Sequence, residues 1–325
     1  MVKQLSKKIL GLIDLSEEKI LFEQSKNIEL NESDILVEIG PLFGRATDAI
    51  IRGLTLNPHY KRKNKLYVYD SFECDVNNFS AQEILNLAKE ENMLSHIRFS
   101  KKLINYEKIL NFNLQSHIDS GDVVTIKNES FNIKPPTNAS IALMRLNFSK
   151  KYSEFKSIIF RFLPQTKINC ILVCDDYFSH WSASIILVTG ILIDRKCLMI
   201  REPAGLSVIF DVIKVPNKTD LIELDLSMQN SNESLRFFDV VINDIKKIRS
   251  NDSEMLVSKI ILAKIQWLYA KGEFGSARDT MLDFFKKSGN SHLLNSLITS
   301  YLDLLGNGFS INQMYKANQI IAIPE

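Results

Sequence analysis

Short apolar runs alternate along the first two thirds of the chain with segments whose apolar positions recur at helical spacing. Ile35–Ile39 is an apolar run interrupted only by Glu38, which is typical of a parallel strand covered on both faces. Gly40 and Gly44 then bracket a tight turn, and Ala46–Leu54 has the spacing of a helix. The stretch therefore predicts a strand, a glycine turn and a helix whose N-terminal amides face the carboxyl end of that strand.

The same alternation continues beyond this first unit. Leu66–Tyr69 is expected to be a second strand, ending in Asp70. Three further apolar runs have the length of buried strands: Val123–Ile126, Ile141–Leu146 and Asn169–Cys174. Leu198–Arg201 and Ser207–Ile213 flank a Pro- and Gly-containing turn and predict a hairpin. The pattern indicates an α/β fold with a Rossmann-like, mostly parallel sheet that is closed by an antiparallel hairpin.

The apolar pattern divides the chain into three parts. Residues 1–30 predict an N-terminal helical segment, and residues 31–215 predict the α/β domain. Residues 75–120 interrupt the strand series as a helical insertion, in which Ala81–Asn92 is helical while Ile97–Phe99 and Leu103–Leu110 fit either a helix or a strand. The insertion is expected either to cover the carboxyl end of the sheet as a lid or to be an inert excursion.

Residues 216–325 predict a separate all-α domain. Leu256–Tyr269, Phe274–Lys287 and His292–Leu305 are amphipathic segments of similar length. The small and aromatic residues of Ala263–Ala277 resemble one tetratricopeptide unit, but stable arrays need about three units. We expect a small TPR-like helical domain that serves oligomerisation or docking of a protein partner.

Composition excludes several classes of protein. With 325 residues, 45% hydrophobic and 24% charged, the chain is typical of a soluble globular protein. A net charge of +2 gives no basic footprint for nucleic acid. No apolar window is long enough for a membrane span, and the apolar positions near the N-terminus are spaced as in a helix rather than a signal peptide. The four cysteines form neither zinc-ligand pairs nor a disulfide framework, so we expect a cytoplasmic protein.

Asp70 is a candidate for binding the ribose of a nucleotide-like ligand. In an open α/β sheet, a carboxylate at this strand tip lies beside the glycine turn and accepts hydrogen bonds from ribose hydroxyls. A Rossmann dehydrogenase is disfavoured because a third glycine is absent after Gly40 and Gly44. The interpretation requires Asp70 to face the glycine turn across an open crevice.

The whole unit resembles class I S-adenosylmethionine-dependent methyltransferases, which carry an acidic residue within the first strand. Three motifs in order narrow the resemblance to the macrocin O-methyltransferase family: Val68–Glu73, Ile141–Asn147, and Ile171–Tyr177 followed by His180 and Trp181. The similarity covers roughly residues 35–215. It implies a methyltransferase that acts on a hydroxyl of a sugar or small polyhydroxylated natural product.

The resemblance also implies a binding site for S-adenosylmethionine. The residues expected to line its methionine side are Glu38, Gly40, Pro41, Gly44 and Arg45. Those expected at its ribose and adenine side are Asp70, Ser71 and Phe72, with Asn128 and Glu129 at the adenine end.

Members of that family bind a divalent metal, which makes Mg²⁺ a second candidate cofactor. Asp175 and Asp176 match its later carboxylate pair, whereas Asn147 and Ser149 stand where the family has aspartates. Oxygen ligands from neighbouring strand tips suit Mg²⁺, so Asp175, Asp176 and Asn147 are the candidate ligands. The alternative for the two aspartates is capping of the following helix.

His180 is the candidate general base, because a histidine near neutral pKa beyond a strand tip can accept a hydroxyl proton. Asp175 is the second candidate for a catalytic role. Since Asn147 and Ser149 replace carboxylates, a competing hypothesis is a catalytically degenerate methyltransferase fold that serves binding or assembly through its helical tail.

Overall fold

The computed structural model describes most of the chain and divides it into two compact units. The described residues are 9, 11–77, 79–128, 133–136, 140–147, 152–179, 181–229, 231–248 and 252–288. The first unit comprises residues 1–148 and 161–175, and the second comprises residues 149–160 and 176–325.

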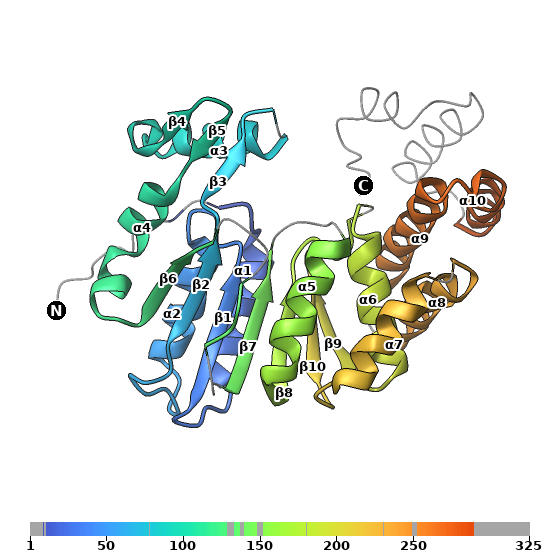
Figure 1. Ribbon diagram of the computed structural model, residues 1–325, viewed down its shortest axis with the longest axis horizontal. Helices are drawn as coiled ribbons and strands as arrows, with labels where there is room; N and C mark the ends of the chain where they lie inside the picture. The colour runs from blue at the N-terminus through green and yellow to red at the C-terminus, as the bar shows by residue number, and fades with distance from the viewer. Residues whose placement is uncertain are drawn as a thin grey trace. The chain divides into compact units, whose positions relative to one another are not determined.

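The first unit contributes five parallel strands, in the order β6-β2-β1-β7-β8, to a seven-stranded sheet (Figure 1). Their bounds are Asp34–Ile39 for β1, Leu66–Asp70 for β2, Val123–Lys127 for β6, Ser140–Leu146 for β7 and Thr166–Cys174 for β8. Every residue of β1 is buried, as expected for a central parallel strand.

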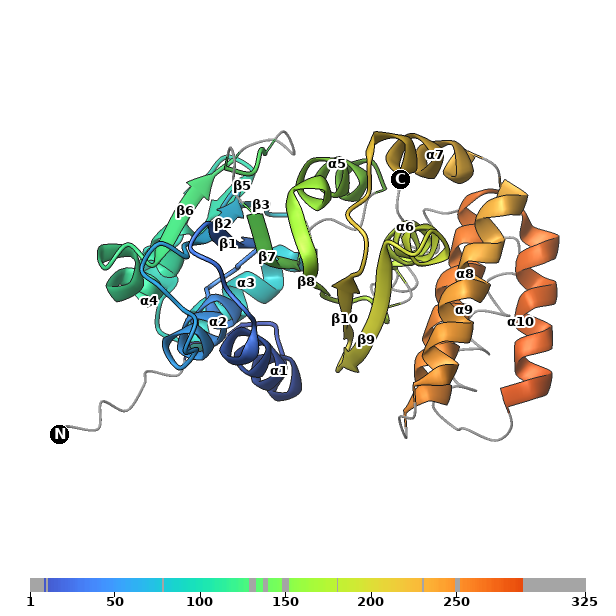
Figure 2. The ribbon, with the colours of Figure 1, turned by 90° about the horizontal axis from the view of Figure 1, so that it is seen from below.

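Two helices of the first unit lie side by side on one face of these strands (Figure 2). Helix α1, Leu15–Asn27, begins with a capping box between Asp14 and Glu17. Helix α2, Arg45–Thr55, begins directly after Gly44, and its apolar face is buried. Gly53 allows close approach, because a Cβ there would lie 2.3 Å from the carbonyl oxygen of Phe22.

The insertion is a small subdomain beyond the carboxyl ends of β1 and β2 (Figure 1). It contains the helices α3, Phe79–Glu90, and α4, Glu107–Asp119, joined by a 3-10 turn at Leu94–His96 and short strands. The two segments that fitted either a helix or a strand overlap β4, Arg98–Ser100, and β5, Leu103–Asn105, and the second also includes the start of α4. Strands β4 and β5 form a three-stranded sheet with β3, Glu73–Asp75. The insertion is therefore mixed rather than wholly helical.

The second unit contributes the antiparallel pair β9, Leu198–Ala204, and β10, Ser207–Val212, to the sheet. Its helix α6, Ala183–Asp194, is buried from Ala183 to Ile193, which explains why its sequence is apolar on all sides. The remaining helices are α5, Tyr152–Phe162, whose last residues belong to the first unit, then α7, Lys218–Gln229, α8, Ser231–Lys247, α9, Ser253–Ala270, and α10, Phe274–Ser288. Helices α8, α9 and α10 pack in succession (Figure 2).

The predicted fold class is confirmed: the chain has a mostly parallel sheet, a closing antiparallel hairpin and a helical C-terminal region. The third C-terminal helix, predicted at His292–Leu305, lies outside the described residues, so the TPR-like character stays a prediction. The domain boundary at residue 216 also stays a prediction. None of the described helices combines the length and the apolar character that crossing a bilayer requires.

Gly40 fixes the approach of two strand ends and gives the first prediction. It has φ +82°, and a Cβ there would lie 1.6 Å from the backbone oxygen of Asn147. Gly40→Ala should therefore lower the free energy of unfolding by more than about 4 kcal/mol, because backbone must move. Gly121 has φ +75° and a Cβ would meet only Lys65 Nζ at 3.5 Å, so Gly121→Ala should cost about 1–2 kcal/mol. Equal losses in urea unfolding of the two variants would contradict the importance of this approach.

Candidate functional site

The predicted site residues lie at neighbouring strand ends, and backbone hydrogen bonds join these ends. The amide of Asn128 donates to Asp70 O at 2.8 Å, and the amide of Gly40 donates to Tyr69 O at 3.0 Å. The amide of Asn147 donates to Ile39 O at 2.8 Å, and that of Asp175 donates to Leu146 O at 3.0 Å. The ladder thus continues one residue past each strand and brings these tips to one edge of the sheet, as the parallel topology requires.

The turn after β1 is tightly folded. The amide of Gly44 donates to Pro41 O at 3.0 Å, and Leu42 and Gly44 have positive φ of 53° and 93°. The Phe43 side chain between them is fully buried in the core of the insertion. A Cβ on Gly44 would meet Leu110 and Leu114 of α4, so this glycine is needed for packing as well as for its φ.

A buried cation links the carboxylates of two strands. Arg145 of β7 donates through Nη1 to Glu38 of β1 and through Nη2 to Asp175 beyond β8. The side chains of all three are at most 7% exposed, and Thr47 Oγ1 of α2 donates to the second oxygen of Glu38 at 2.6 Å. Arg145 lies within the predicted strand Ile141–Leu146. Its signal was present, since a charged residue inside an apolar strand needs a buried partner.

Burial and charge act against each other within this network. Burial raises the pKa of Glu38, although Arg145 and Thr47 act in the opposite direction. Burial acts to lower the pKa of Arg145, but Asp175 and Glu38 raise it above its ordinary value. One guanidinium therefore stays charged between two carboxyl groups, and Glu38 holds its proton more readily than an exposed glutamate.

These contacts do not suit the predicted Mg²⁺ site. Asp175 already binds a guanidinium, which would repel a divalent ion, and the carboxylate of Glu38 is fully engaged. Asp176 lies in the following turn with φ 54°, where its backbone oxygen accepts a hydrogen bond from Ser182 Oγ. Among the described residues, no group of three His, Cys, Asp or Glu side chains could hold a metal ion.

Asp70 lies at the tip of β2, as expected, and its carboxylate is engaged by the chain itself. Its Oδ1 accepts the amide of Phe72 at 2.8 Å. The hydroxyl of Tyr106 donates to both carboxylate oxygens, at 3.0 Å and 3.1 Å. Burial raises the pKa of Asp70 to about 6, although these hydrogen bonds oppose the rise.

The expectation of an open crevice between Asp70 and the glycine turn is not met in this structure. The Tyr106 ring is 6% exposed and packs against Phe43 of the turn and Phe72 of the β2 exit, with centroid distances of 6.1 Å and 6.4 Å. Aromatic side chains thus occupy the space between the Asp70 carboxylate and the Gly40–Gly44 turn. Nothing in the sequence singled out Tyr106, which follows a three-residue strand.

Two more predicted cofactor residues have other partners. The Arg45 guanidinium donates through Nε and Nη2 to Glu18 at 2.9 Å and 2.8 Å, and through Nη1 to Ile13 O, so it ties α2 to α1. Ser71 Oγ donates to the backbone oxygen of Glu73 at 3.1 Å and shapes the exit of β2. Their contact with a cofactor stays a prediction, as do those of Gly40, Pro41, Gly44, Phe72 and Asn128.

Some of the predicted residues lie outside the described residues. They are Glu129, expected at the adenine end, the candidate base His180, and Ser149 at the expected carboxylate position. Their roles stay predictions from the resemblance.

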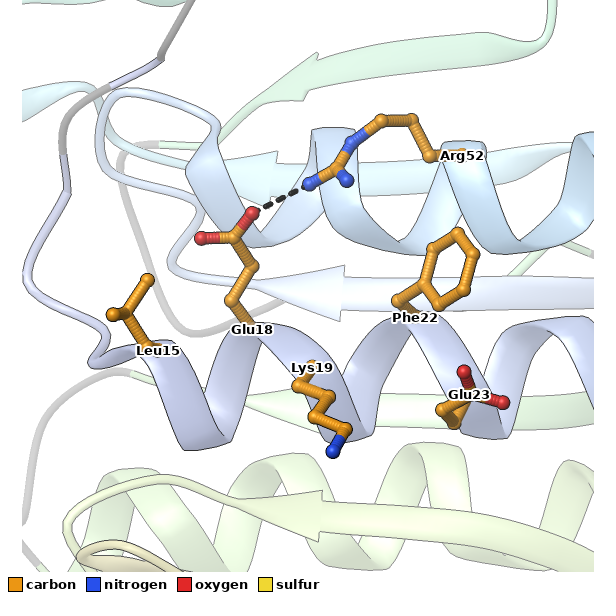
Figure 3. A pocket seen from close by; sticks show the side chains of 6 residues that line it. All are labelled: Leu15, Glu18, Lys19, Phe22, Glu23 and Arg52. Atoms are coloured by element: carbon orange, nitrogen blue, oxygen red, sulfur yellow. Dashed lines mark hydrogen bonds and ion pairs between the residues drawn. The ribbon is translucent and has the colours of Figure 1, made fainter.

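A surface hollow elsewhere on the first unit contains none of the predicted site residues. It is lined by five residues of α1 and by Arg52 of α2, which forms an ion pair with Glu18 at 2.6 Å (Figure 3). The lining residues are Leu15, Glu18, Lys19, Phe22, Glu23 and Arg52. Arg52 also binds Asp48, so its guanidinium is paired with two carboxylates of the chain.

Known proteins offer only distant likeness. No protein-family model and no curated protein matches the sequence. Among solved structures, the O-methyltransferase NovP is similar at 13% identity and a TM-score of 0.43, over 63% of this chain and 82% of that chain. The TDP-rhamnose 3'-O-methyltransferase CalS11 is similar at 15% identity and a TM-score of 0.40, over 61% and 78%. At this level of likeness, the geometry of the chain itself has to carry any functional conclusion.

The buried network gives the second prediction. Arg145→Met should lower the free energy of unfolding by about 3–5 kcal/mol, because it leaves two buried carboxyl groups without their cation. Arg52→Met is the matched control, since Arg52 also binds two carboxylates, Glu18 and Asp48, but is 39% exposed. It should cost less than about 1 kcal/mol in the same urea unfolding experiment. Similar losses for both variants would show that burial does not determine how much the Arg145 network contributes to the free energy of unfolding.

Asp70 gives the third prediction, on the pH dependence of stability. Its pKa rises from 3.8 to about 6 in the folded chain, so the unfolded state releases this proton at lower pH. The wild type should therefore lose up to about 3 kcal/mol of unfolding free energy through this group as the pH rises from about 4 to about 7. Asp70→Asn should remove that part of the slope.

Asp122→Asn is the control for this titration. Asp122 also accepts hydrogen bonds from a tyrosine, Tyr60, and a serine, Ser120. Burial acts to raise its pKa, but the hydrogen bonds hold it below its ordinary value. The stability it contributes is thus present above the unfolded pKa and is lost only in more acidic solution, so Asp122→Asn should keep the wild-type slope above about pH 5. A wild-type slope in Asp70→Asn would refute the assignment.

Proposed function

We propose that the chain binds S-adenosylmethionine at the carboxyl ends of β1, β2 and β6 and transfers its methyl group to a hydroxyl of a sugar or small polyhydroxylated molecule. Tyr106 fills the crevice that this site requires, so binding of the cofactor requires that side chain to move away. The observation that carries the proposal is the state of Asp70. Its carboxylate stands at a strand tip next to the Gly40–Gly44 turn and already receives a hydroxyl on both oxygens. A ribose offers the same kind of donor to such a carboxylate.

The neighbouring elements support this placement. The glycine turn leads from the buried strand β1 into α2, so the first amides of α2 lie close to the strand ends. The β6 exit lies beside Asp70 through the hydrogen bond of the Asn128 amide, which supports the assignment of Asn128 to the adenine side. When bound there, S-adenosylmethionine supplies an electrophilic methyl group.

The acceptor chemistry rests on the resemblance in the sequence. His180 is the proposed acceptor of the hydroxyl proton, because an imidazole of near-neutral pKa suits that role. Asp175 is not proposed as a base, since its carboxylate binds the buried Arg145. The proposal includes no metal ion, because the fixed guanidinium stands among the carboxyl groups that would hold it.

One observation favours a second candidate function. The space beside Asp70 is filled by Tyr106, and the backbone oxygen of Asn147 closes over Gly40. A catalytically degenerate protein that keeps the fold for binding or assembly, with its helical tail as docking surface, would need no cofactor crevice. Binding of the cofactor therefore decides between the two functions.

Calorimetric titration with S-adenosylhomocysteine gives the fourth prediction. The wild type should bind it saturably, because the Asp70 carboxylate can accept hydrogen bonds from both ribose hydroxyls. Asp70→Asn should bind about tenfold more weakly, because the amide offers one uncharged acceptor oxygen in place of the carboxylate. Asp122→Asn removes a carboxylate with the same kinds of donors at the opposite end of β6, and it should bind like the wild type. Absence of binding by the wild type and by Tyr106→Phe, which removes the hydroxyl that occupies Asp70, would favour the degenerate fold.

A further inference from the structure

The side chain that closes the Asp70 site belongs to the insertion and not to the sheet. Tyr106 precedes α4 directly, and its amide donates to Phe72 O at 3.0 Å. Its hydroxyl lies within hydrogen-bond distance of both oxygens of Asp70. One side chain of the insertion thus covers the part of the carboxylate that the proposed function assigns to ribose.

The Tyr106 hydroxyl donates to Asp70 in the same way as a sugar hydroxyl would. A carboxylate accepts only, so any hydroxyl that binds it must donate, whether it belongs to a tyrosine or a ribose. Burial, and then the neighbouring Asp70, raise the pKa of Tyr106 well above its ordinary value, so this hydroxyl keeps its proton and remains a donor. The two hydroxyls compete for the same oxygens.

The surroundings of the ring determine how it can leave. It contacts Phe43 and Phe72 edge-on or tilted, with interplanar angles of 60° and 82°. Its polar side-chain anchor is Asp70 itself. The side chain is therefore held by aromatic packing, which phenylalanine would retain, and by one hydroxyl, which phenylalanine would lose.

We infer that Tyr106 is a built-in competitor for the nucleoside: its hydroxyl occupies the ribose-binding side of Asp70, and the methyl donor binds only when this side chain moves away. This inference rests on the proposed function, whose site it regulates. The apparent affinity for the donor is then the intrinsic affinity multiplied by the fraction of molecules in which Tyr106 has left Asp70.

The fifth prediction tests the competition in the full chain with two ligands that share the ribose, S-adenosylhomocysteine and adenosine. Tyr106→Phe should bind both about tenfold more tightly than the wild type in calorimetric titration, because the competing hydrogen bond to a charged group is gone. Tyr60→Phe is the matched control: it removes another tyrosine–aspartate hydrogen bond of the first unit, 2.8 Å long, and should leave both affinities within about twofold.

A double-mutant cycle ties the effect to Asp70. In an Asp70→Asn background, the gain from Tyr106→Phe should shrink to less than about twofold, since the bond it relieves is already weakened. Circular dichroism and urea unfolding of each variant establish that it is folded before titration. Tyr106→Leu serves in place of Tyr106→Phe should the latter unfold.

The outcomes separate the inference from the function on which it rests. Equal affinities of wild type and Tyr106→Phe would overturn the competition and leave the binding site standing. Weaker binding by Tyr106→Phe would overturn it as well, because the hydroxyl would then contact the ligand. If neither protein binds either ligand, the proposed function fails and the inference fails with it.

Discussion

The structure of the first unit depends on a single buried guanidinium. Arg145 lies on β7 between β1 and β8, and it satisfies carboxyl groups from both. Removing one cation and two carboxylates from water is costly, and only close, well-directed pairing offsets the cost. A shift of one residue in the pairing of either neighbouring strand would turn a carboxylate to the other face and leave a buried charge alone. The network therefore makes the register of three central strands a condition for folding.

Register in turn places the strand ends. With β1, β7 and β8 aligned, Gly40, Asn147 and Asp175 must follow one another across the edge, and the close approach of Gly40 to the Asn147 backbone leaves no side chain between them. Strand β2, on the other side of β1, ends differently. The tip of β2 carries Asp70, which is held by a turn of its own and by a tyrosine from the insertion. One edge of the sheet thus combines a part locked by internal charge with a part closed by a separate subdomain.

Sequence pattern was sufficient for the strands of the main sheet but not for this division. The apolar runs located the five parallel strands within a few residues, because parallel strands have few polar positions. Asp70 could be placed at a strand tip because topology alone puts it there. Arg145 carried a readable signal, a charge within an apolar strand, but its partners come from distant strands and only the fold brings them together. Tyr106 carried no such signal. Its position depends on aromatic contacts with two separate loops, and such contacts produce no periodic pattern in the sequence.

The carboxyl groups of Glu38 and Asp70 differ in how readily their partners can be exchanged. Glu38 and Asp70 both lose hydration, yet their partners differ in kind. Displacing Arg145 from Glu38 or Asp175 would strand a buried cation, for which a neutral ligand offers no replacement. Displacing the Tyr106 hydroxyl from Asp70 exchanges one neutral donor for another, and the tyrosine can find water instead. Exchange of hydrogen-bond partners therefore costs less free energy at the tip of β2 than in the Arg145 network, where it would leave a charge without its partner.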